Sequence, residues 1–287
     1  MKAAPVNIQL SWGTLEGLHW SNPGAPKVLC LHGWLDNAAS FVPLSTYLQD
    51  FDLLALDFAG HGFSSHRPVN SRYYFLENIY DVDAALDVLG WDTCHLIGHS
   101  MGGGVASCFA AAVPERINRM VSLDAVGMLT LSADKTAKQL RLSVKSVRRA
   151  RSFLRPYESV EEAMRARQKG APLSDQAARL LCERSLEHTG DYYQWRTDPR
   201  LNWRSPQLMT DAQVLDVLAT IRSPVLAITS PAAEEFMGGS MLKKRLDAIV
   251  DCTHMTDEGH HHFHMEQPLL TGKRITEFLQ QQDEPDD

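Results

Sequence analysis

Short runs of consecutive apolar residues recur along the chain, and stretches with helical spacing separate most of them. The runs cover residues 28–31, 53–56, 94–97, 120–123 and 225–228. Strands that are apolar on both faces and bounded by Gly, Asp or Pro are typical of a buried parallel sheet. Because strands and helices alternate, the pattern predicts an α/β fold in which helices cover both faces of a parallel sheet.

Two other patterns flank these runs. Residues 8–20 alternate between apolar and polar, which favours an antiparallel hairpin at one edge of the sheet. Helical spacing covers residues 76–89 and 102–113, and Gly90 follows the first of these as a C-terminal stop. Ligands of such folds bind beyond the carboxyl ends of the strands, so we expect the functional site at that edge.

The alternation breaks between about residues 129 and 206, where we expect several helices and no strand. Ser159 and Glu162 have the spacing of a capping box, and Ser174 is a further N-cap candidate. The alternation of strands and helices resumes after a second capping box, formed by Thr210 and Gln213. An all-helical insertion between two strands of one sheet predicts a lid over the carboxyl edge, inside a single domain that spans residues 1–287. Residues 280–287 are acidic with nothing apolar to bury, which predicts a disordered tail.

Composition narrows the class of partner and the compartment. The net charge of −7 argues against a nucleic-acid partner. The five cysteines are odd in number, widely spaced and without a C-x-x-C pair, a pattern typical of reduced thiols in a cytosolic protein. The first residues form no apolar leader, and no stretch of about 18 apolar residues occurs, so we expect no membrane partner. These features predict a cytoplasmic monomer or homodimer.

The main candidate for chemistry follows the apolar run 94–97. Residues 98–102 read GHSMG, and Gly103 and Gly104 open a helical pattern. G-x-S-x-G between a strand and a helix is the signature of a nucleophile elbow. The serine backbone in such a turn is strained, side chains at the two glycines would collide with neighbours, and the helix N-terminus favours negative charge. We therefore predict that Ser100 is a nucleophile.

A second candidate lies where the first of the apolar runs ends, in the sequence HGW at residues 32–34. A tetrahedral oxyanion needs preorganised N–H donors, each worth a few kcal/mol of the barrier. One donor is expected from Met101, which follows the nucleophile. We expect the other from Trp34, because Gly33 permits a close approach of the backbone.

Three motifs together resemble the α/β-hydrolase superfamily in type, order and spacing: HGW at 32–34, DFAGHGFS at 57–64 and GHSMGG at 98–103. Within it, HGWLDNAASF at 32–41, HRP at 66–68 and DPRL at 198–201 are similar to the serine-hydrolase-like branch. The resemblance covers residues 17 to 279, approximately. It implies an eight-stranded, mostly parallel α/β-hydrolase sheet with a helical lid, hydrolysis of an ester-like bond, and no cofactor.

The resemblance also implies that the catalytic base is a histidine near the C-terminus. In the family it stands five residues before the acidic residue of E-x-P, and counting back from Glu266 gives His261. The family's Gly–His dipeptide gives His260 instead, so His261 is preferred and His260 is the alternative. Consecutive histidines do not easily converge on one ion, and no Cys or Asp ligand set accompanies them, so we expect no metal site.

Two strand ends can supply the acid in this family. After the strand that follows the lid, Ala233 occupies the usual Asp position, with Glu234 one residue late. The other position is the end of the strand after the nucleophile helix, and here that residue is Asp124. We predict Asp124 as the acid, with Glu234 as the alternative. Asp57 also ends a strand, and we expect it to brace the turn at residues 60–62 rather than to act as acid or nucleophile.

The combined prediction is a carboxylesterase-like hydrolase of a small-molecule acyl substrate. His261 takes the proton of Ser100 as Oγ attacks, and water later resolves the acyl-enzyme. A C–C-bond hydrolase or a thioesterase would use the same residues. A haloalkane dehalogenase or epoxide hydrolase is disfavoured, since those enzymes carry Asp at the position of Ser100. A catalytically silent binding protein of the same fold is the alternative from another class, and only the missing Asp at position 233 supports it.

Overall fold

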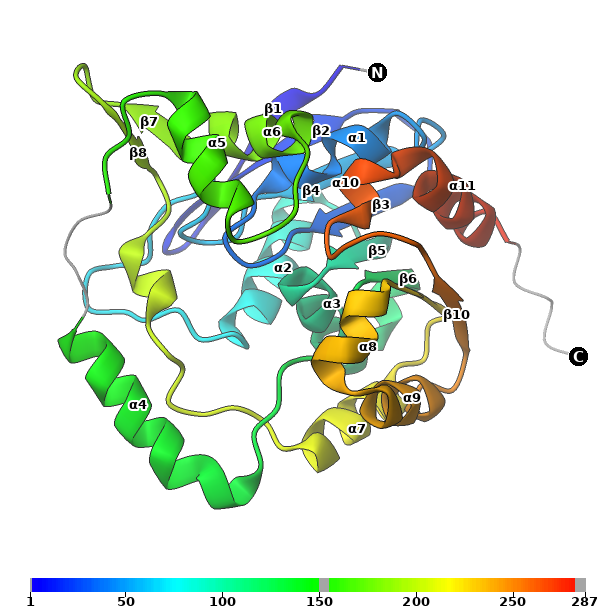
Figure 1. Cartoon of the computed structure of the whole chain (residues 1–287). Helices are drawn as coiled ribbons and strands as arrows, with labels where there is room; N and C mark the ends of the chain where they lie inside the picture. The colour runs from blue at the N-terminus through cyan, green and yellow to red at the C-terminus, as the bar shows by residue number, and fades with distance from the viewer. Residues whose placement is uncertain (1, 150–154, 282–287) are drawn as a thin grey trace, which may run out of the picture.

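A mostly parallel sheet forms the centre of the computed structural model, which describes residues 2–149 and 155–281 (Figure 1). Its eight strands run in the order β1-β2-β4-β3-β5-β6-β9-β10. The β1–β2 and β2–β4 pairs are antiparallel and all the others are parallel, which confirms the predicted sheet. The bounds are β1 (Ala4–Leu10), β2 (Gly13–Trp20), β3 (Lys27–Leu31), β4 (Asp52–Leu56), β5 (Cys94–His99), β6 (Ile117–Leu123), β9 (Val225–Thr229) and β10 (Cys252–Thr256).

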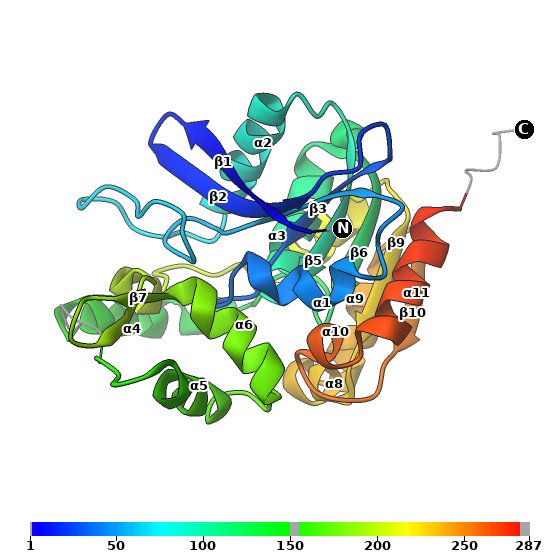
Figure 2. The same ribbon diagram turned by 90° about the horizontal axis from the view of Figure 1, so that it is seen from above.

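Both faces of the sheet are buried, which explains why the central strands read as apolar runs. In β3, Leu29 and Leu31 join one core while Val28 and Cys30 join the other, and all four are fully buried. Helices supply the rest of each core on opposite faces (Figure 2). The first face carries α2 (Glu77–Leu89), α3 (Met101–Ala112), α7 (Asp211–Thr220) and α9 (Gly239–Ala248), and the second carries α1 (Val42–Ser45), α10 (Phe263–Glu266) and α11 (Pro268–Leu279).

The sequence pattern did not reveal one strand of the sheet, β10. Among the described residues, this strand lies at an edge of the sheet and has β9 as its one neighbour. Its residues are mostly exposed or half-buried and include Thr253, His254 and Thr256. A strand that buries little on either face carries no apolar run, so nothing in its composition marks it.

Between β6 and α7 the chain leaves the sheet and forms an insertion. Its helices are α4 (Thr136–Arg148), α5 (Val160–Gln168) and α6 (Asp175–Ser185), and residues 150–154 lie outside the described part. The prediction that the insertion contains no strand was wrong, because β7 (Leu186–His188) and β8 (Tyr193–Trp195) pair as a separate antiparallel hairpin. Strands of three residues are too short to show an alternating pattern.

Polar caps define where these helices begin. The Ser159 side chain accepts a bond from the Glu162 N–H, but the Glu162 carboxylate binds the N–H of Glu158, so only half of this predicted capping box forms. Ser174 caps α6 as predicted. Thr210 and Gln213 form a complete box at α7.

The insertion is not uniform in its contacts. Helices α5 and α6 form a small core of their own and lie near the loops that follow β3 and β4. Helix α4 lies away from the sheet, at the lower left of Figure 1. Its side chains Gln139 and Ser143 donate to the backbone oxygens of Ser205 and Arg204, so the described contacts hold it to the segment that leads back toward the sheet.

Three further observations concern membrane-spanning helices, the cysteines and the C-terminal tail. No helix within residues 2–149 or 155–281 is both long enough and apolar enough to cross a membrane. All five cysteines are free thiols, and four of them are buried. Most of the predicted tail, residues 282–287, lies outside the described residues, whereas Gln280 caps α11 and its side chain donates to Asp50.

Candidate active site

Ser100 lies on a sharp turn between β5 and α3. Its backbone adopts φ 52° and ψ −115°, a conformation that non-glycine residues rarely occupy. Its N–H donates to Leu123 O at 2.9 Å, which ties the turn to β6. A Cβ on Gly98 would overlap the Gly102 carbonyl, and a Cβ on Gly102 would overlap the carbonyl oxygen of Leu31. Both glycines are therefore required by close backbone packing, as the motif predicts.

Asp124 directly follows β6 and contacts the histidine loop, residues 257–262 between β10 and α10. Its Oδ2 accepts a hydrogen bond of 2.6 Å from His261 Nδ1, and its Oδ1 accepts one of 2.6 Å from the N–H of Ser230. Burial by itself would raise the pKa of Asp124, but the hydrogen bonds from His261 and Ser230 outweigh it and lower that pKa below its usual value. Because an ionised carboxylate only accepts, Nδ1 of His261 carries the proton and Nε2 is left as an acceptor.

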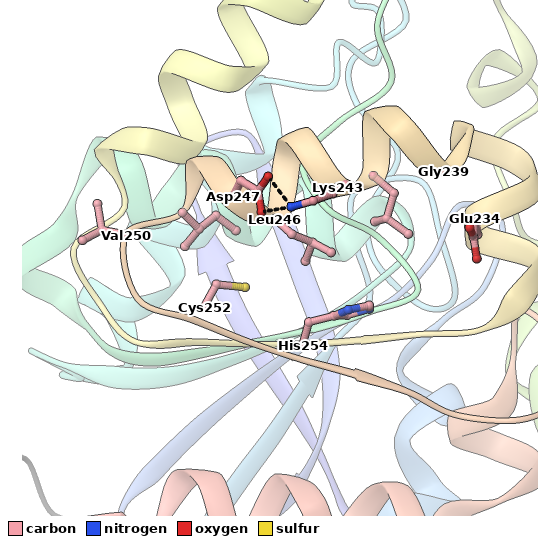
Figure 3. A pocket seen from close by; sticks show the side chains of 10 residues that line it. Glu234, Gly239, Lys243, Leu246, Asp247, Val250, Cys252 and His254 are labelled. Carbon is pink, nitrogen blue, oxygen red and sulfur yellow. Dashed lines mark hydrogen bonds and ion pairs between the residues drawn. The ribbon is translucent and has the colours of Figure 1, made fainter.

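The two alternatives from the sequence lie elsewhere. His260 is exposed, and no described side-chain hydrogen bond involves it. Glu234, on α8 (Pro231–Met237), is exposed and makes no hydrogen bond with His261. It lines a recess of about 480 Å³ between α9 and β10, together with Lys243 and His254 (Figure 3). The structure thus brings Asp124 to His261 and brings neither His260 nor Glu234 into this pair.

The loop after β3 packs directly on the elbow. A Cβ on Gly33 would lie 2.9 Å from His99 Nδ1, so a larger residue has no room there. The loop is held by buried His32, whose Nδ1–H donates to Gly33 O at 2.7 Å while its Nε2 accepts from the Phe58 N–H at 3.0 Å. Both bonds need a neutral ring, and burial lowers the pKa of His32 to about 4.

The two expected oxyanion donors are the backbone N–H groups of Trp34 and Met101. Within the described ranges neither N–H donates to a protein acceptor. Met101 is the first residue of α3, where the helix leaves its N–H without an internal partner. Trp34 follows Gly33, where an added Cβ would lie 2.9 Å from His99 Nδ1, one residue before Ser100.

Asp57 braces the turn that follows β4. Its Oδ1 accepts from the Ala38 N–H at 2.7 Å and its Oδ2 from the Phe63 N–H at 2.9 Å. A Cβ on Gly62 would overlap the Asp57 carboxyl group, so the turn wraps closely around it. Arg184 of α6 completes the arrangement with an ion pair of 2.8 Å to Asp57. The sequence indicated the bracing role but not Arg184, because the pair spans residues that are distant along the chain.

One polar cluster beside the candidate site was also missed. Asp36, His99 and His262 each offer a ligand atom, and these atoms lie within 4.8 Å of one another. All three residues are buried. The sequence argument considered only the consecutive histidines, whereas Asp36 lies in the loop after β3 and His99 is the last residue of β5. Nothing in their spacing along the chain signals that they meet.

Comparisons with known proteins agree with the fold described above. A family model described as alpha/beta hydrolase fold matches residues 26–238. A serine hydrolase-like protein of Danio rerio is 32% identical, over 98% of this chain and 89% of its own length. A serine hydrolase-like protein of Dictyostelium discoideum is 31% identical, over 94% of this chain and 77% of its own. A crystal structure of a hypothetical protein from Pseudomonas aeruginosa matches with a TM-score of 0.89 and 33% identity, covering 98% of this chain and 100% of that one.

Proposed function

The chain belongs to the α/β-hydrolase fold family and its serine hydrolase-like branch, and from this premise we propose that it cleaves a carboxylic-ester-like bond of a small molecule through an acyl-enzyme on Ser100. It is a hydrolase by family. To this family assignment the proposal adds the type of bond that is cleaved, the covalent intermediate and the residues that carry out the reaction. The observation that supports it most is the 2.6 Å bond between Asp124 and His261, formed beside a serine held at positive φ.

The proposed reaction uses Ser100, His261 and Asp124 as a triad. His261 Nε2 takes the Oγ proton as Oγ bonds to the acyl carbon, and it then gives that proton to the leaving alkoxide as the ester C–O bond breaks. Water attacks the acyl-enzyme next, with its proton passing through Nε2 to Ser100 Oγ. The products are an alcohol and a carboxylic acid. Asp124 holds the imidazole in the required tautomer and stabilises the imidazolium.

The oxyanion that forms in each half of the reaction is assigned to the N–H groups of Trp34 and Met101. Two features support this assignment: neither N–H has a protein acceptor among the described residues, and Met101 N–H lies at the positive end of α3. Loss of one such donor typically costs about 3–4 kcal/mol of barrier.

We further propose that the insertion at about residues 129–206 is a lid over the carboxyl edge of the sheet. Arg167 of α5 binds Asp36 and Arg184 of α6 binds Asp57. Both acidic residues follow strands that end at this edge, β3 and β4. A lid in this position would exclude water and shape the substrate cleft. The single domain, the cytoplasmic location and the monomeric or dimeric state stay predictions of the sequence.

A substrate panel tests the proposal. p-Nitrophenyl esters from acetate to decanoate, acyl-CoA thioesters and meta-cleavage compounds are each offered to the wild-type protein and to Ser100→Ala. We expect the wild type to hydrolyse esters with a preference for one chain length and Ser100→Ala to hydrolyse none. If only the thioesters are hydrolysed, the same triad belongs to a thioesterase. If only the meta-cleavage compounds are hydrolysed, it belongs to a C–C-bond hydrolase. No turnover of any compound would favour a silent binding protein.

A further inference from the structure

A buried charged cluster lies beside the proposed catalytic residues. At its centre is Asp36, in the loop after β3, which is 2% exposed. Its Oδ1 binds the guanidinium of Arg167 from α5, and its Oδ2 lies 3.1 Å from His262 Nε2. The cluster therefore joins the β3 loop, the insertion and the histidine loop through the two oxygens of one carboxylate.

His99, the last residue of β5, brings a fourth segment of the chain to this cluster. Its Nε2 lies 2.8 Å from the backbone oxygen of His261, and since a carbonyl oxygen cannot donate, Nε2 carries the proton. His99 Nδ1 is then the unprotonated nitrogen, and it faces Asp36 Oδ2 at 3.6 Å, beyond hydrogen-bond distance. Asp36 therefore interacts with two side chains, Arg167 and His262. His99 contacts the histidine loop directly, through the backbone oxygen of His261.

Asp36 is ionised in this environment. Burial would raise the pKa of its carboxyl group, but the hydrogen bond from His262 and the charge of Arg167 hold that pKa well below its usual value. A buried carboxylate orients its donors strongly, because any donor that moves away leaves a charge uncompensated in a region of low dielectric. The orientations of Arg167 and His262 are therefore tied to one another through Asp36.

The partners of this cluster are the chain neighbours of the proposed catalytic residues. His262 follows His261, and His99 precedes Ser100. The ring of His99 lies with its centroid 4.7 Å from that of His261 and 5.0 Å from that of His262. A shift of either loop would therefore change the distance between the base and the nucleophile.

We propose that Asp36 is a positioning residue, which sets the histidine loop against the nucleophile elbow and couples both to the insertion through Arg167. This inference rests on the proposed function of Ser100 and His261. The described side-chain contacts of Asp36 are with Arg167, His262 and His99, and none is with Ser100 or His261 themselves. Its effect is exerted through His262, and a small displacement of a reacting group is enough to change the rate by about 10- to 100-fold.

A metal ion is the rival use of the same cluster. Asp36, His99 and His262 have the donor types of a zinc site, and both ring nitrogens of nearby His264 lack a hydrogen-bond partner among the residues that the structure describes. However, Arg167 already neutralises the carboxylate, so a divalent cation would leave two uncompensated positive charges in a buried site. The described contacts favour the hydrogen-bonded arrangement, and the experiment includes the metal as an outcome.

Asp36→Asn in the full chain tests the proposal, with Asp57→Asn as the matched control. Asp57 is also buried and also pairs with an arginine of the insertion, but none of its hydrogen bonds or ion pairs reaches the histidine loop. The readouts are the rate at which a fluorophosphonate labels Ser100, and kcat and KM for the preferred ester. We expect Asp36→Asn to lower labelling and kcat by about 10- to 100-fold with little change in KM, and Asp57→Asn to lower them much less.

Variants of the partner keep the test decisive if Asp36→Asn does not fold. Arg167→Ala is expected to lower kcat in the same direction, and Arg167→Lys to restore most of it by supplying a charge. If the fluorophosphonate labels the wild type and Asp36→Asn equally fast, the positioning role is overturned and the proposed function stays intact. A wild-type protein that is not labelled at all would instead overturn the proposed function, and this inference with it.

Metal analysis completes the experiment. Purified wild-type protein is incubated with Zn²⁺, desalted and examined by inductively coupled plasma mass spectrometry beside His262→Ala. The hydrogen-bonded arrangement predicts no stoichiometric zinc in either protein. One zinc per chain in the wild type, lost in His262→Ala, would replace the positioning role with a metal site.

Discussion

At the scale of single residues, backbone strain gathers at the proposed site. Leu35, Ser100 and Asp124 are the non-glycine residues with positive φ in the described part of the chain. Ser100 and Asp124 are the proposed nucleophile and acid, and Leu35 follows Trp34 in the β3 loop. Such conformations cost about 1–3 kcal/mol each and persist only where the surrounding structure enforces them. Strain at these positions supports the proposed roles independently of the sequence motifs.

The acid can be tested by one pair of variants. Asp124→Asn is expected to lower kcat by about four orders of magnitude, because an amide at this position stabilises the wrong tautomer of His261. Glu234→Gln is the matched control and is expected to change kcat little, since Glu234 does not contact His261. Steady-state hydrolysis of the preferred ester gives both values. The reverse ranking would transfer the acid role to Glu234.

The tight packing of the elbow is tested by Gly102→Ala. The added methyl group would overlap the Leu31 carbonyl oxygen, a backbone atom that no rotamer change can move away. We expect a loss of about 3 kcal/mol or more in the free energy of unfolding, with loss of serine labelling. Gly170→Ala is the control, because its nearest neighbouring atom lies 3.5 Å from the new Cβ. Urea denaturation compares the two, and equal small effects would contradict the packing argument.

A site residue could be predicted from the sequence when the pattern that marks it lies within a few neighbouring residues. Ser100 stands in a motif of five consecutive residues, so its environment could be inferred from the sequence. Asp124 could be proposed because a strand end is visible in the pattern. Asp36 and Arg184 could not be found, because each acts through partners more than 100 residues away. Pairing at that distance along the chain depends on the completed fold.

At the scale of elements, buried ion pairs connect the insertion to the sheet. Arg184 on α6 pairs with Asp57, and Asn37 donates to the Leu181 carbonyl oxygen of the same helix. The guanidinium of Arg184 also stacks on Phe63 with 4.9 Å to the ring centroid. These contacts hold α6 to the loops after β3 and β4, so the proposed lid is attached by specific polar contacts near the site.

Removing one arginine measures this attachment. Arg184→Ala leaves the fully buried Asp57 carboxylate without its counter-ion, which typically costs about 3–5 kcal/mol of stability. Arg179→Ala on the same helix is the control, because Arg179 pairs with Glu161 and Glu183 at the surface and its loss is expected to change stability little. Urea denaturation of both variants decides the point. Equal effects would show that the Asp57 pair does not anchor α6.

The elements themselves were predictable where they bury apolar surface in a regular pattern. All five apolar runs lie within strands, and Gly90 ends α2 in the left-handed conformation. The strands that escaped prediction, β7, β8 and β10, are short or exposed. Strand β10 is placed by hydrogen bonding to β9, and β7 and β8 by hydrogen bonding to each other. Such pairing leaves little trace in composition.

At the scale of the whole molecule, several neutral histidines are buried in the fold. Burial lowers the pKa of His32 to about 4, of His61 to about 3 and of His99 to about 4, and it holds the pKa of His264 well below its usual value. In the unfolded chain these groups return to a pKa of about 6.5. The unfolded state therefore binds more protons than the native state at every pH between those values.

This difference predicts how stability depends on pH. The contribution of these histidines is fully present above about pH 6.5, and it is lost as the pH falls from there toward about 4, because protonation then favours the unfolded chain. Each histidine contributes a slope of up to about 1.4 kcal/mol per pH unit. Urea denaturation at several pH values across this window measures the total slope. A free energy of unfolding that stays constant through the window would contradict the neutral, buried state of these rings.

Covalent labelling of the whole protein tests the central claim, that Ser100 is a nucleophile activated by His261. The protein is treated with a fluorophosphonate, its intact mass is measured, and the modified peptide is sequenced by mass spectrometry. We predict a single adduct on Ser100, absent in Ser100→Ala, greatly slowed in His261→Ala and unaffected in His260→Ala. An adduct that persists in Ser100→Ala, or a wild-type protein that forms none, would contradict the claim.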